Sequence, residues 1–290
     1  MYKGLHIKVC ALSKYGKYTM LEDSLKFLAC PICHGRLDVE VNVIMGDDVI
    51  EGLLRCLSCG RVYRIRDGIA DFLTHEILNE VDREVMFAYD KTALKYDILM
   101  TYVFPLLSLG IEPFERFMWV RELGLRRGSV VLDVATGTGR NLGFLARVVG
   151  KGGLIFGLDI SWNALLVAKR RARSLGNVVL MRCNASYLPF RDEVFDGVMH
   201  VGGINTFGEK SRALNEMVRV AKHGGRIVIV DEGLKPSKRN TLVGRFLLRL
   251  NALYASLPPV KELPKGTTNL KVVWKVVPFF PYYVMVFQKR

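Results

Sequence analysis

The chain has 290 residues, a formal net charge of +14, and hydrophobic residues at half of its positions. That length accommodates one large α/β domain together with a small accessory module. No apolar run reaches the roughly 18 to 20 residues that a membrane-spanning helix needs, which argues against an integral membrane protein. The N-terminus lacks the apolar core and small-residue cleavage site of a secretory signal, so we expect a cytoplasmic protein.

The positive charge is concentrated at the C-terminal end of the chain. Residues 233–290 carry 11 lysines and arginines against a single acidic residue, Glu262. This asymmetry predicts an anionic partner at that end, because a basic field attracts negatively charged molecules over long distances. A surface that only keeps the protein soluble is the alternative.

Residues 1–20 have no clear periodicity and contain four lysines without an acidic residue. We interpret them as a leader, which is either a disordered basic arm or an artefact of start-codon assignment. No function is assigned to this segment.

Two Cys-x-x-Cys pairs follow, in a region that we assign to residues 21–75. Between the two pairs lie 22 residues. Paired motifs of this kind bring four thiolates to one tetrahedral centre, as in structural zinc sites, whose closed coordination leaves no position for catalysis. Disulfides are the poorer interpretation in a reducing cytoplasm. The predicted ligands of a structural Zn²⁺ are Cys30, Cys33, Cys56 and Cys59.

This region also resembles a known module. Residues 37–43 and 60–65 alternate in polarity, which predicts short strands around the metal, and Arg66-Asp67-Gly68-Ile69 ends the segment. The two cysteine pairs and this ending are similar to the small zinc-ribbon subunit that activates several tRNA, rRNA and protein methyltransferases. The resemblance covers residues 21 to 74 and implies that such a ribbon is fused here to a catalytic domain.

Residues 76–128 are predicted to form a helical connector or cap. Apolar residues recur at threes and fours between Glu76 and Glu122, and Asn79 is among the candidate capping positions. Pro105 and Pro113 divide the stretch into segments.

From residue 129 onward, strands and helices alternate, which predicts a doubly wound parallel sheet with ligands at the carboxyl ends of its strands. The predicted strands are 130–134, 154–159, 178–183, 194–200 and 226–231. The predicted helices are 140–148, 162–175 and 209–220. A basic run at 169–173 lies opposite apolar residues of its helix, so we interpret it as a solvated face.

The first of these strands runs into a glycine turn around which the chain is organised. Asp133 lies inside the strand, and Gly137 and Gly139 precede a predicted helix whose N-terminal N–H groups and dipole would face a ligand. A dinucleotide fingerprint requires Gly-x-Gly-x-x-Gly, but Gly143 comes one residue too late. A carboxylate at Asp133 instead suits a ligand that carries a positively charged ammonium group. Asp159, at the end of the second strand, is placed to accept hydrogen bonds from both hydroxyls of a ribose.

The motifs of this region carry a second family resemblance. They are Asp133-Val-Ala-Thr-Gly-Thr-Gly139, Leu158-Asp159-Ile160-Ser161, Leu188-Pro189-Phe190 and Phe195-Asp196-Gly197-Val198. They resemble class I S-adenosylmethionine methyltransferases, and residues 88–290 are nearest to the ubiquinone/menaquinone C-methyltransferase-like branch. The resemblance implies S-adenosylmethionine as cofactor and an α/β fold with a seven-stranded, doubly wound, Rossmann-like methyltransferase sheet in residues 129–290. The cofactor-binding residues that it implies are Asp133, Ala135, Gly137, Gly139, Asp159, Ile160, Asn184 and Ala185.

Methyl transfer from a sulfonium is a direct displacement, so alignment and exclusion of water supply most of the catalysis, and a base is needed only if the acceptor must lose a proton. His200, at the end of the predicted strand 194–200, is the best-placed candidate base, and a hydrogen-bonded framework residue is the alternative. Residues 88–97 resemble the family helix that closes over cofactor and acceptor with a tyrosine facing the site. Tyr96 and Tyr89 therefore become candidates, although tyrosines at helical spacing more often pack half-buried.

Residues 241–257 are predicted to form an amphipathic helix with Arg245 and Arg249 beside its apolar face. That face suits a lid over a lipophilic acceptor, a helix on a membrane surface, or ordinary core packing, and core packing is the default. Residues 270–277 and 282–289 are predicted to form the last, antiparallel hairpin of the sheet.

We therefore predict an S-adenosylmethionine-dependent methyltransferase that acts on a small or lipophilic acceptor, because the sequence after Asp196 is C-methyltransferase-like. An rRNA or tRNA base methyltransferase is the competing enzyme, since the order of ribbon and catalytic domain resembles the 23S rRNA guanine-N1 methyltransferases. A third hypothesis is a non-catalytic partner protein that binds the cofactor. The intact glycine loop and Asp159 disfavour it.

Overall fold

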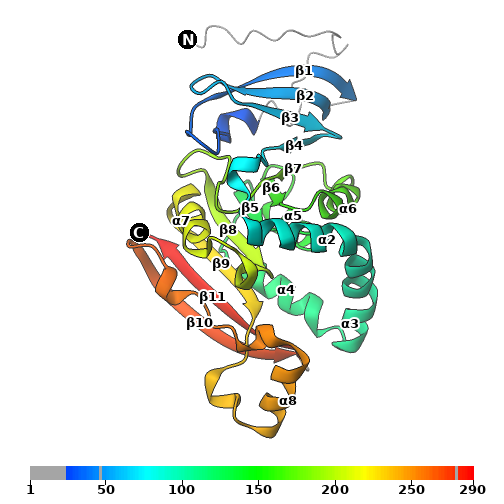
Figure 1. Ribbon diagram of the computed structural model, residues 1–290, viewed down its shortest axis with the longest axis vertical. Coiled ribbons are helices and arrows are strands. Elements are labelled where there is room, and N and C mark those ends of the chain that lie inside the picture. Colours follow the sequence, from blue (N-terminus) through cyan, green and yellow to red (C-terminus); the bar gives the residue numbers. More distant parts are fainter. Residues whose placement is uncertain (1–23, 46–47, 278–279) are drawn as a thin grey trace.

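The computed structural model describes residues 24–45, 48–277 and 280–290, whose strands form one continuous sheet of eleven (Figure 1). The strand order across the sheet is β1-β2-β3-β4-β7-β6-β5-β8-β9-β11-β10. The predicted leader at residues 1–20 lies outside the described residues.

Seven neighbouring strands make the predicted methyltransferase sheet. The five parallel strands are β5 (Val130–Val134), β6 (Leu154–Asp159), β7 (Val178–Arg182), β8 (Phe195–Val201) and β9 (Ala221–Glu232). The last two are β10 (Thr267–Val277) and β11 (Phe280–Lys289), which form an antiparallel hairpin, with β11 also antiparallel to β9. Both faces of the parallel strands are buried, as their continuous apolar sequences require. The predicted doubly wound fold is thus confirmed.

Helices cover both faces of this sheet. Buried residues of α4 (Ile111–Glu122), α5 (Leu142–Val149) and α6 (Trp162–Ala172) pack on one face. Those of α7 (Lys210–Val220) pack on the other face, in the same hydrophobic cluster as the ribbon core. These four helices lie on the faces of the sheet, so a site can form at the carboxyl ends of the parallel strands.

The connector is mostly helical, as predicted. Helix α2 (Glu80–Ile98) begins at Asn79, whose side chain accepts a hydrogen bond from the backbone N–H of Asp82 at 2.8 Å. It continues through a π-helical turn (Leu99–Val103) into the short α3 (Phe104–Leu107), which has Pro105 in its first turn. Asp90 on α2 accepts a 2.6 Å hydrogen bond from the Ser161 hydroxyl, which fixes α2 beside the start of α6.

No single helix among the described residues is long and apolar enough to cross a bilayer. One pair, Glu80–Leu107 with Ile111–Glu122, reaches that length and composition together but is bent by 106° at its junction.

The ribbon continues the methyltransferase sheet instead of forming a separate layer. Its strands are β1 (Leu37–Met45), β2 (Asp48–Cys56), β3 (Val62–Arg66) and β4 (Ile69–Asp71). The sequence predicted strands at the first and third of these positions. Strand β4 pairs in parallel with β7, with Ala70 opposite Met181 and Asp71 opposite Arg182. One hydrophobic cluster therefore runs from the ribbon into the catalytic sheet.

The predicted helix at 241–257 is wrong in its second half. Helix α8 spans only Leu242–Leu250, because Asn251 is extended and its side chain accepts from the backbone N–H of Leu253 at 2.9 Å. The default of core packing is also wrong for most of this helix. Leu247 is buried, but Leu242 is 82% exposed and Leu250 is 64% exposed.

Candidate functional site

The glycine loop after β5 has the backbone conformation of a ligand-binding turn. Ala135 has a φ of 53°, Gly137 of 56° and Gly139 of 79°, a left-handed region in which side chains are strained. A Cβ atom on Gly139 would lie 2.8 Å from the Leu142 side chain and 3.0 Å from that of Ala168. Only glycine therefore lets the loop pass between Leu142 at the start of α5 and Ala168 in the second half of α6.

Asp133 is fully buried beneath this loop. Its carboxylate accepts a 2.6 Å hydrogen bond from the Thr136 hydroxyl and a 3.0 Å hydrogen bond from the Asn141 amide. Burial raises the pKa of Asp133 to about 6, against the opposing effect of these hydrogen bonds. In this structure the carboxylate predicted to meet a cofactor ammonium group holds the two ends of the glycine loop together.

A network of ion pairs that the sequence did not predict holds Asp133 in place through Asn141. The side-chain amide oxygen of Asn141 accepts a hydrogen bond from the guanidinium of Arg116, which also pairs with Glu112 at 2.6 Å. Glu112 pairs in turn with Arg140 at 3.0 Å. Nη1 of Arg140 is buried without a hydrogen-bond partner among the described residues. The spacing of Glu112 and Arg116 on one helix face was the only signal of this network in the sequence.

Asp159 joins the end of β6 to the same loop. Its two carboxylate oxygens accept hydrogen bonds of 2.8 Å from the backbone N–H groups of Gly137 and Ser161. Burial raises the pKa of Asp159 to about 6. These backbone donors therefore fix the orientation of the carboxylate before a ribose binds to it.

A small cavity beside Asp159 gathers five of the eight predicted cofactor residues. It contains about 50 Å³ of free space. The predicted residues that line it are Ala135, Asp159, Ile160, Asn184 and Ala185. Asp82 and Val85 of α2 also line it, with Phe207. Ligand pockets usually measure roughly 300 Å³ or more, so this cavity is too small for a nucleoside while Asp82, Val85 and Phe207 keep these positions.

Asn184 shows how α2 closes this cavity. Its amide nitrogen donates hydrogen bonds of 2.8 Å to the carbonyl of Ile77 and to the carboxylate of Asp82. Its amide oxygen accepts from the backbone N–H of Ser186 at 2.9 Å. Both amide hydrogens of the side chain predicted to recognise adenine are therefore used by protein groups around the start of α2, and the amide oxygen can accept one further hydrogen bond.

His200 is fully buried at the end of β8. Its Nδ1 lies 3.0 Å from the carbonyl oxygen of Val134 and must carry the proton, since a carbonyl only accepts. Nε2 consequently has a free lone pair, and it has no partner among the described residues. Burial lowers the pKa of His200 to about 4, so the imidazole is neutral at pH 7. The ring of Phe207 packs edge-on at 5.1 Å.

Tyr89 and Tyr96 lie on one face of α2, with their rings in edge contact at 6.3 Å. Part of each side chain is exposed, but burial of the two phenols raises their pKa values. The negative charge of Asp159 adds to the rise at Tyr89, whereas the positive charges of Arg116 and Arg140 oppose the rise at Tyr96. Both tyrosines thus face the edge of the sheet where the predicted cofactor residues lie.

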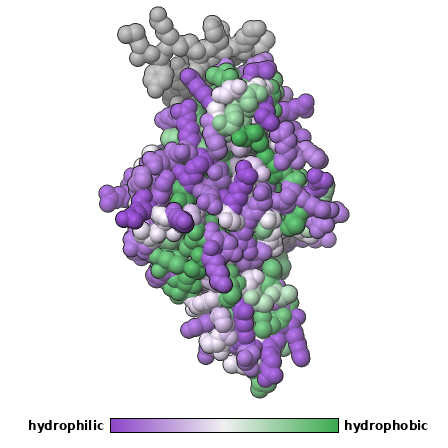
Figure 2. All heavy atoms as spheres, turned by 60° about the vertical axis from the view of Figure 1, so that its left-hand side comes forward, coloured by the Kyte–Doolittle hydropathy of each residue, from purple (hydrophilic) through white to green (hydrophobic). Residues whose placement is uncertain are grey.

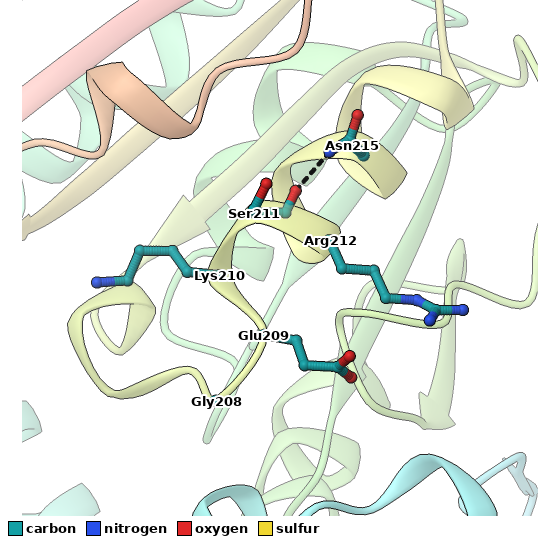
Figure 3. Close-up of a pocket in the computed structure, with 6 residues that line it drawn as sticks. All are labelled: Gly208, Glu209, Lys210, Ser211, Arg212 and Asn215. Carbon is teal, nitrogen blue, oxygen red and sulfur yellow. Dashed lines mark hydrogen bonds between the residues drawn. The ribbon is translucent and has the colours of Figure 1, made fainter.

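A second hollow lies at the start of α7 and is open and polar (Figure 3). Lys210 and Arg212 extend from the helix in opposite directions there. The Arg212 guanidinium stacks 3.7 Å from the centre of the Tyr187 ring and donates to the Ser186 carbonyl. No predicted site residue lines this hollow, so we do not assign it to the reaction.

The four ribbon cysteines converge as predicted. All four Sγ atoms lie within 4.8 Å of one another, with Cys30 to Cys59 at 3.8 Å and Cys33 to Cys56 at 3.5 Å. A tetrahedron with Zn–S bonds of about 2.3 Å places its sulfurs about 3.8 Å apart, so the donor set fits Zn²⁺. The Tyr63 hydroxyl lies 3.0 Å from the Cys30 sulfur and donates to it when it is a thiolate.

Comparison with protein families identifies two parts of the chain. A model described as the ubiE/COQ5 methyltransferase family matches residues 78–241. A second model, described as Trm112p-like protein, matches residues 23–68. The second match contains all four cysteines of the cluster.

Curated relatives and solved structures agree with the first match. The ubiquinone/menaquinone biosynthesis C-methyltransferase UbiE of Pectobacterium carotovorum is 33% identical over 171 residues, which are 57% of this chain and 66% of that protein. The protein of the same name from Haemophilus ducreyi is 34% identical over 155 residues, 52% of this chain and 58% of its own. The chain thus spans about three-fifths of the length of these relatives. A geranyl diphosphate methyltransferase structure superposes with a TM-score of 0.50 at 16% identity, over 62% of this chain and 86% of that one, which shows a shared fold.

Proposed function

Because the chain belongs to the ubiE/COQ5 methyltransferase family and is an S-adenosylmethionine-dependent methyltransferase, we propose that it methylates a small lipophilic acceptor. The named relatives support this proposal, since they are C-methyltransferases of ubiquinone and menaquinone biosynthesis. By analogy, the proposed acceptor is methylated at a carbon atom.

The lining of the sheet edge is the observation that carries the proposal. Phe207 lines the cavity beside Asp159 and packs edge-on against His200, and the paired rings of Tyr89 and Tyr96 lie on α2, the helix that closes this cavity. An aromatic or aliphatic acceptor gains from contact with such rings, whereas a strongly hydrated acceptor would lose its water there.

S-adenosylmethionine would supply an electrophilic methyl group at this edge. The residues proposed to hold it are those of the glycine loop, with Asp159 at the ribose and Asn184 at the adenine. Helix α2 would then exclude water, because Asp82 and Val85 close the cavity from above.

The proposed role of His200 is to hold a proton. An acceptor carbon that gains a methyl group must release one proton, either from that carbon or from a neighbouring hydroxyl. Nε2 of His200 has a free lone pair and no competing partner among the described residues, so it can receive that proton. Its low pKa keeps it in the receptive, neutral state.

The proposed role of the metal is structural. Zn²⁺ on Cys30, Cys33, Cys56 and Cys59 would have no open coordination position. It would hold together the ribbon, which shares its core with the catalytic sheet.

Incubation of cell extract with the protein and methyl-labelled S-adenosylmethionine tests the acceptor. We expect label in the lipid fraction, and no label with the Asp159→Ala variant, whose ribose contact is lost. Label confined to RNA would overturn the lipophilic acceptor. It would favour the base methyltransferase that the Trm112p-like match suggests.

A further inference from the structure

The end of the molecule opposite the ribbon carries an unusual concentration of exposed apolar side chains. It consists of residues 102–109, around α3, and residues 235–250, around α8, which we call the basic tip (Figure 1). Figure 2 shows apolar and hydrophilic atoms intermixed at this lower end. Its most exposed apolar residues are Tyr102, Leu106, Leu107 and Leu109, at 58–83%, and Leu242, Val243, Phe246 and Leu250, at 59–82%.

The two halves of the basic tip meet at one end of the β10–β11 hairpin. The ring of Phe104 in α3 packs edge-on against Phe280 at 4.3 Å. The next residue, Pro281, accepts a 3.1 Å hydrogen bond from the backbone N–H of Gly233, where the α8 segment begins. The exposed residues of α3 and α8 thus belong to one end of the fold.

The charge of the basic tip has a single sign. Three of its five cationic residues precede α8 and two lie within it, and neither half contains an acidic residue. The five are Lys235, Lys238, Arg239, Arg245 and Arg249. Arg245 and Arg249 rise from the same short helix as the exposed Phe246 and Leu250. This is the composition of helices that lie in the interface of an anionic membrane.

We propose that the basic tip docks on the surface of a bilayer that contains anionic phospholipids. Phe246 and its apolar neighbours would enter the acyl boundary while the four exposed cations, Lys235, Lys238, Arg245 and Arg249, contact lipid phosphates. The guanidinium of Arg239 donates instead to the carbonyls of Leu234 and Ser256. A second copy of the chain is a poorer partner, because two tips of like charge repel each other. Nucleic acid is also poorer, since six of the eight exposed apolar residues are aliphatic and offer no ring on which a base can stack.

Docking at this end would bring the site close to the lipid. The segment that carries α8 leaves β9 directly after Glu232, at the carboxyl end of the parallel sheet. Ligands of such sheets bind at that end. The proposal does not depend on the acceptor, because membrane attachment can be measured without turnover.

Flotation of the full chain with vesicles tests the proposal. One set contains phosphatidylcholine alone and the other adds phosphatidylglycerol at about one third of the lipid. We expect the chain to float with the anionic vesicles, and each removed cation to weaken binding roughly fivefold. Raising the salt concentration should release the protein by screening the phosphates.

Two variants locate the surface. Phe246→Ser with Leu250→Ser should abolish flotation, because both side chains are exposed and their removal leaves the core intact. Leu57→Ser is the matched control, since Leu57 is exposed to the same 59% as Phe246 but lies in the ribbon. Equal losses in both variants, or no binding to anionic vesicles, would overturn the proposal. Two further results would overturn it. One is self-association in sedimentation that is lost only in the Phe246 and Leu250 variant, and the other is binding to polyuridylate that is lost only in that variant.

Discussion

The amide of Asn184 donates a 2.8 Å hydrogen bond to the carboxylate of Asp82, which joins the end of β7 to the first turn of α2. An Asn184→Asp variant would place two carboxylates in contact. We expect this variant to lose about 3–5 kcal/mol of stability at pH 7, the typical effect of an uncompensated buried charge. Urea denaturation measures it.

The pH dependence of Asn184→Asp has a definite sign. Repulsion raises the pKa of the new pair above its value in the unfolded chain, so the variant loses stability as pH rises from about 4 to 7. Adding Asp82→Asn should restore part of the loss by recreating an amide–carboxylate pair. An unchanged stability in the single variant would show that the Asn184 contact is dispensable.

The ribbon is expected to support the cofactor site through the shared core. Cys56→Ser removes one of four sulfur ligands, so we expect metal content to fall from about one zinc per chain and thermal stability to fall with it. S-adenosylmethionine affinity should also decrease, because Phe72 and Arg182 join ribbon and sheet by a 2.8 Å backbone hydrogen bond. Elemental analysis measures the metal content, and calorimetry measures the thermal stability and the S-adenosylmethionine affinity. Cys183→Ala is the control for metal content alone, since Cys183 lies outside the cluster but lines the cavity beside Asp159. Full zinc content in Cys56→Ser would contradict the prediction.

We expect Arg116 to stabilise the glycine loop through its hydrogen bond to Asn141. Arg116→Met leaves Glu112 buried with one cation fewer and removes the donor to Asn141, so we expect a loss of about 3–5 kcal/mol. Cofactor affinity should fall as well, because Asn141 orients Asp133. Arg121→Met, at an exposed position of the same helix, should change stability by less than about 0.5 kcal/mol. Equal effects of the two variants would exclude a special role for the network.

The contrast between predicted and missed features has physical causes. The strands after residue 129 are mostly apolar runs that alternate with segments of helical periodicity, so their order could be predicted. The four cysteines could be predicted from spacing alone. Strand β4 could not, because its three residues have too short a pattern, although their pairing with β7 fuses two modules.

Tertiary contacts explain the other misses. Arg171 lies in the basic run that we interpreted as a solvated face, yet it pairs with Asp97 of α2 at 2.6 Å and donates to the Thr138 carbonyl. Sequence periodicity places Arg171 on a helix face but does not reveal which helix covers it. The same limit applies to α8, whose amphipathic pattern is real and whose apolar face is nevertheless exposed.

His200 should affect both stability and turnover. Its pKa falls from about 6.5 to about 4 on folding, so the chain gains stability as pH rises from about 4 to 6.5, by up to about 3 kcal/mol. His200→Gln should remove this gain and lower kcat by roughly 10²–10⁴ if the residue receives the proton. His223→Gln, an exposed histidine, is the control. A normal kcat in His200→Gln would leave His200 a framework residue.

The left-handed Ala135 offers a test of the glycine loop itself. Its φ of 53° is unfavourable for a residue with a Cβ atom, so Ala135→Gly should relieve strain and raise stability by up to about 1 kcal/mol. Ala146→Gly inside α5 is the matched control and should lower stability by about 1 kcal/mol. Glycine there increases the conformational entropy of the unfolded chain and relieves no strain in the folded chain. Thermal denaturation of both variants measures the difference. Destabilisation by Ala135→Gly would mean that the methyl group packs favourably enough to outweigh the strain. The wild-type loop would then be held by side-chain contact as well as by its glycines.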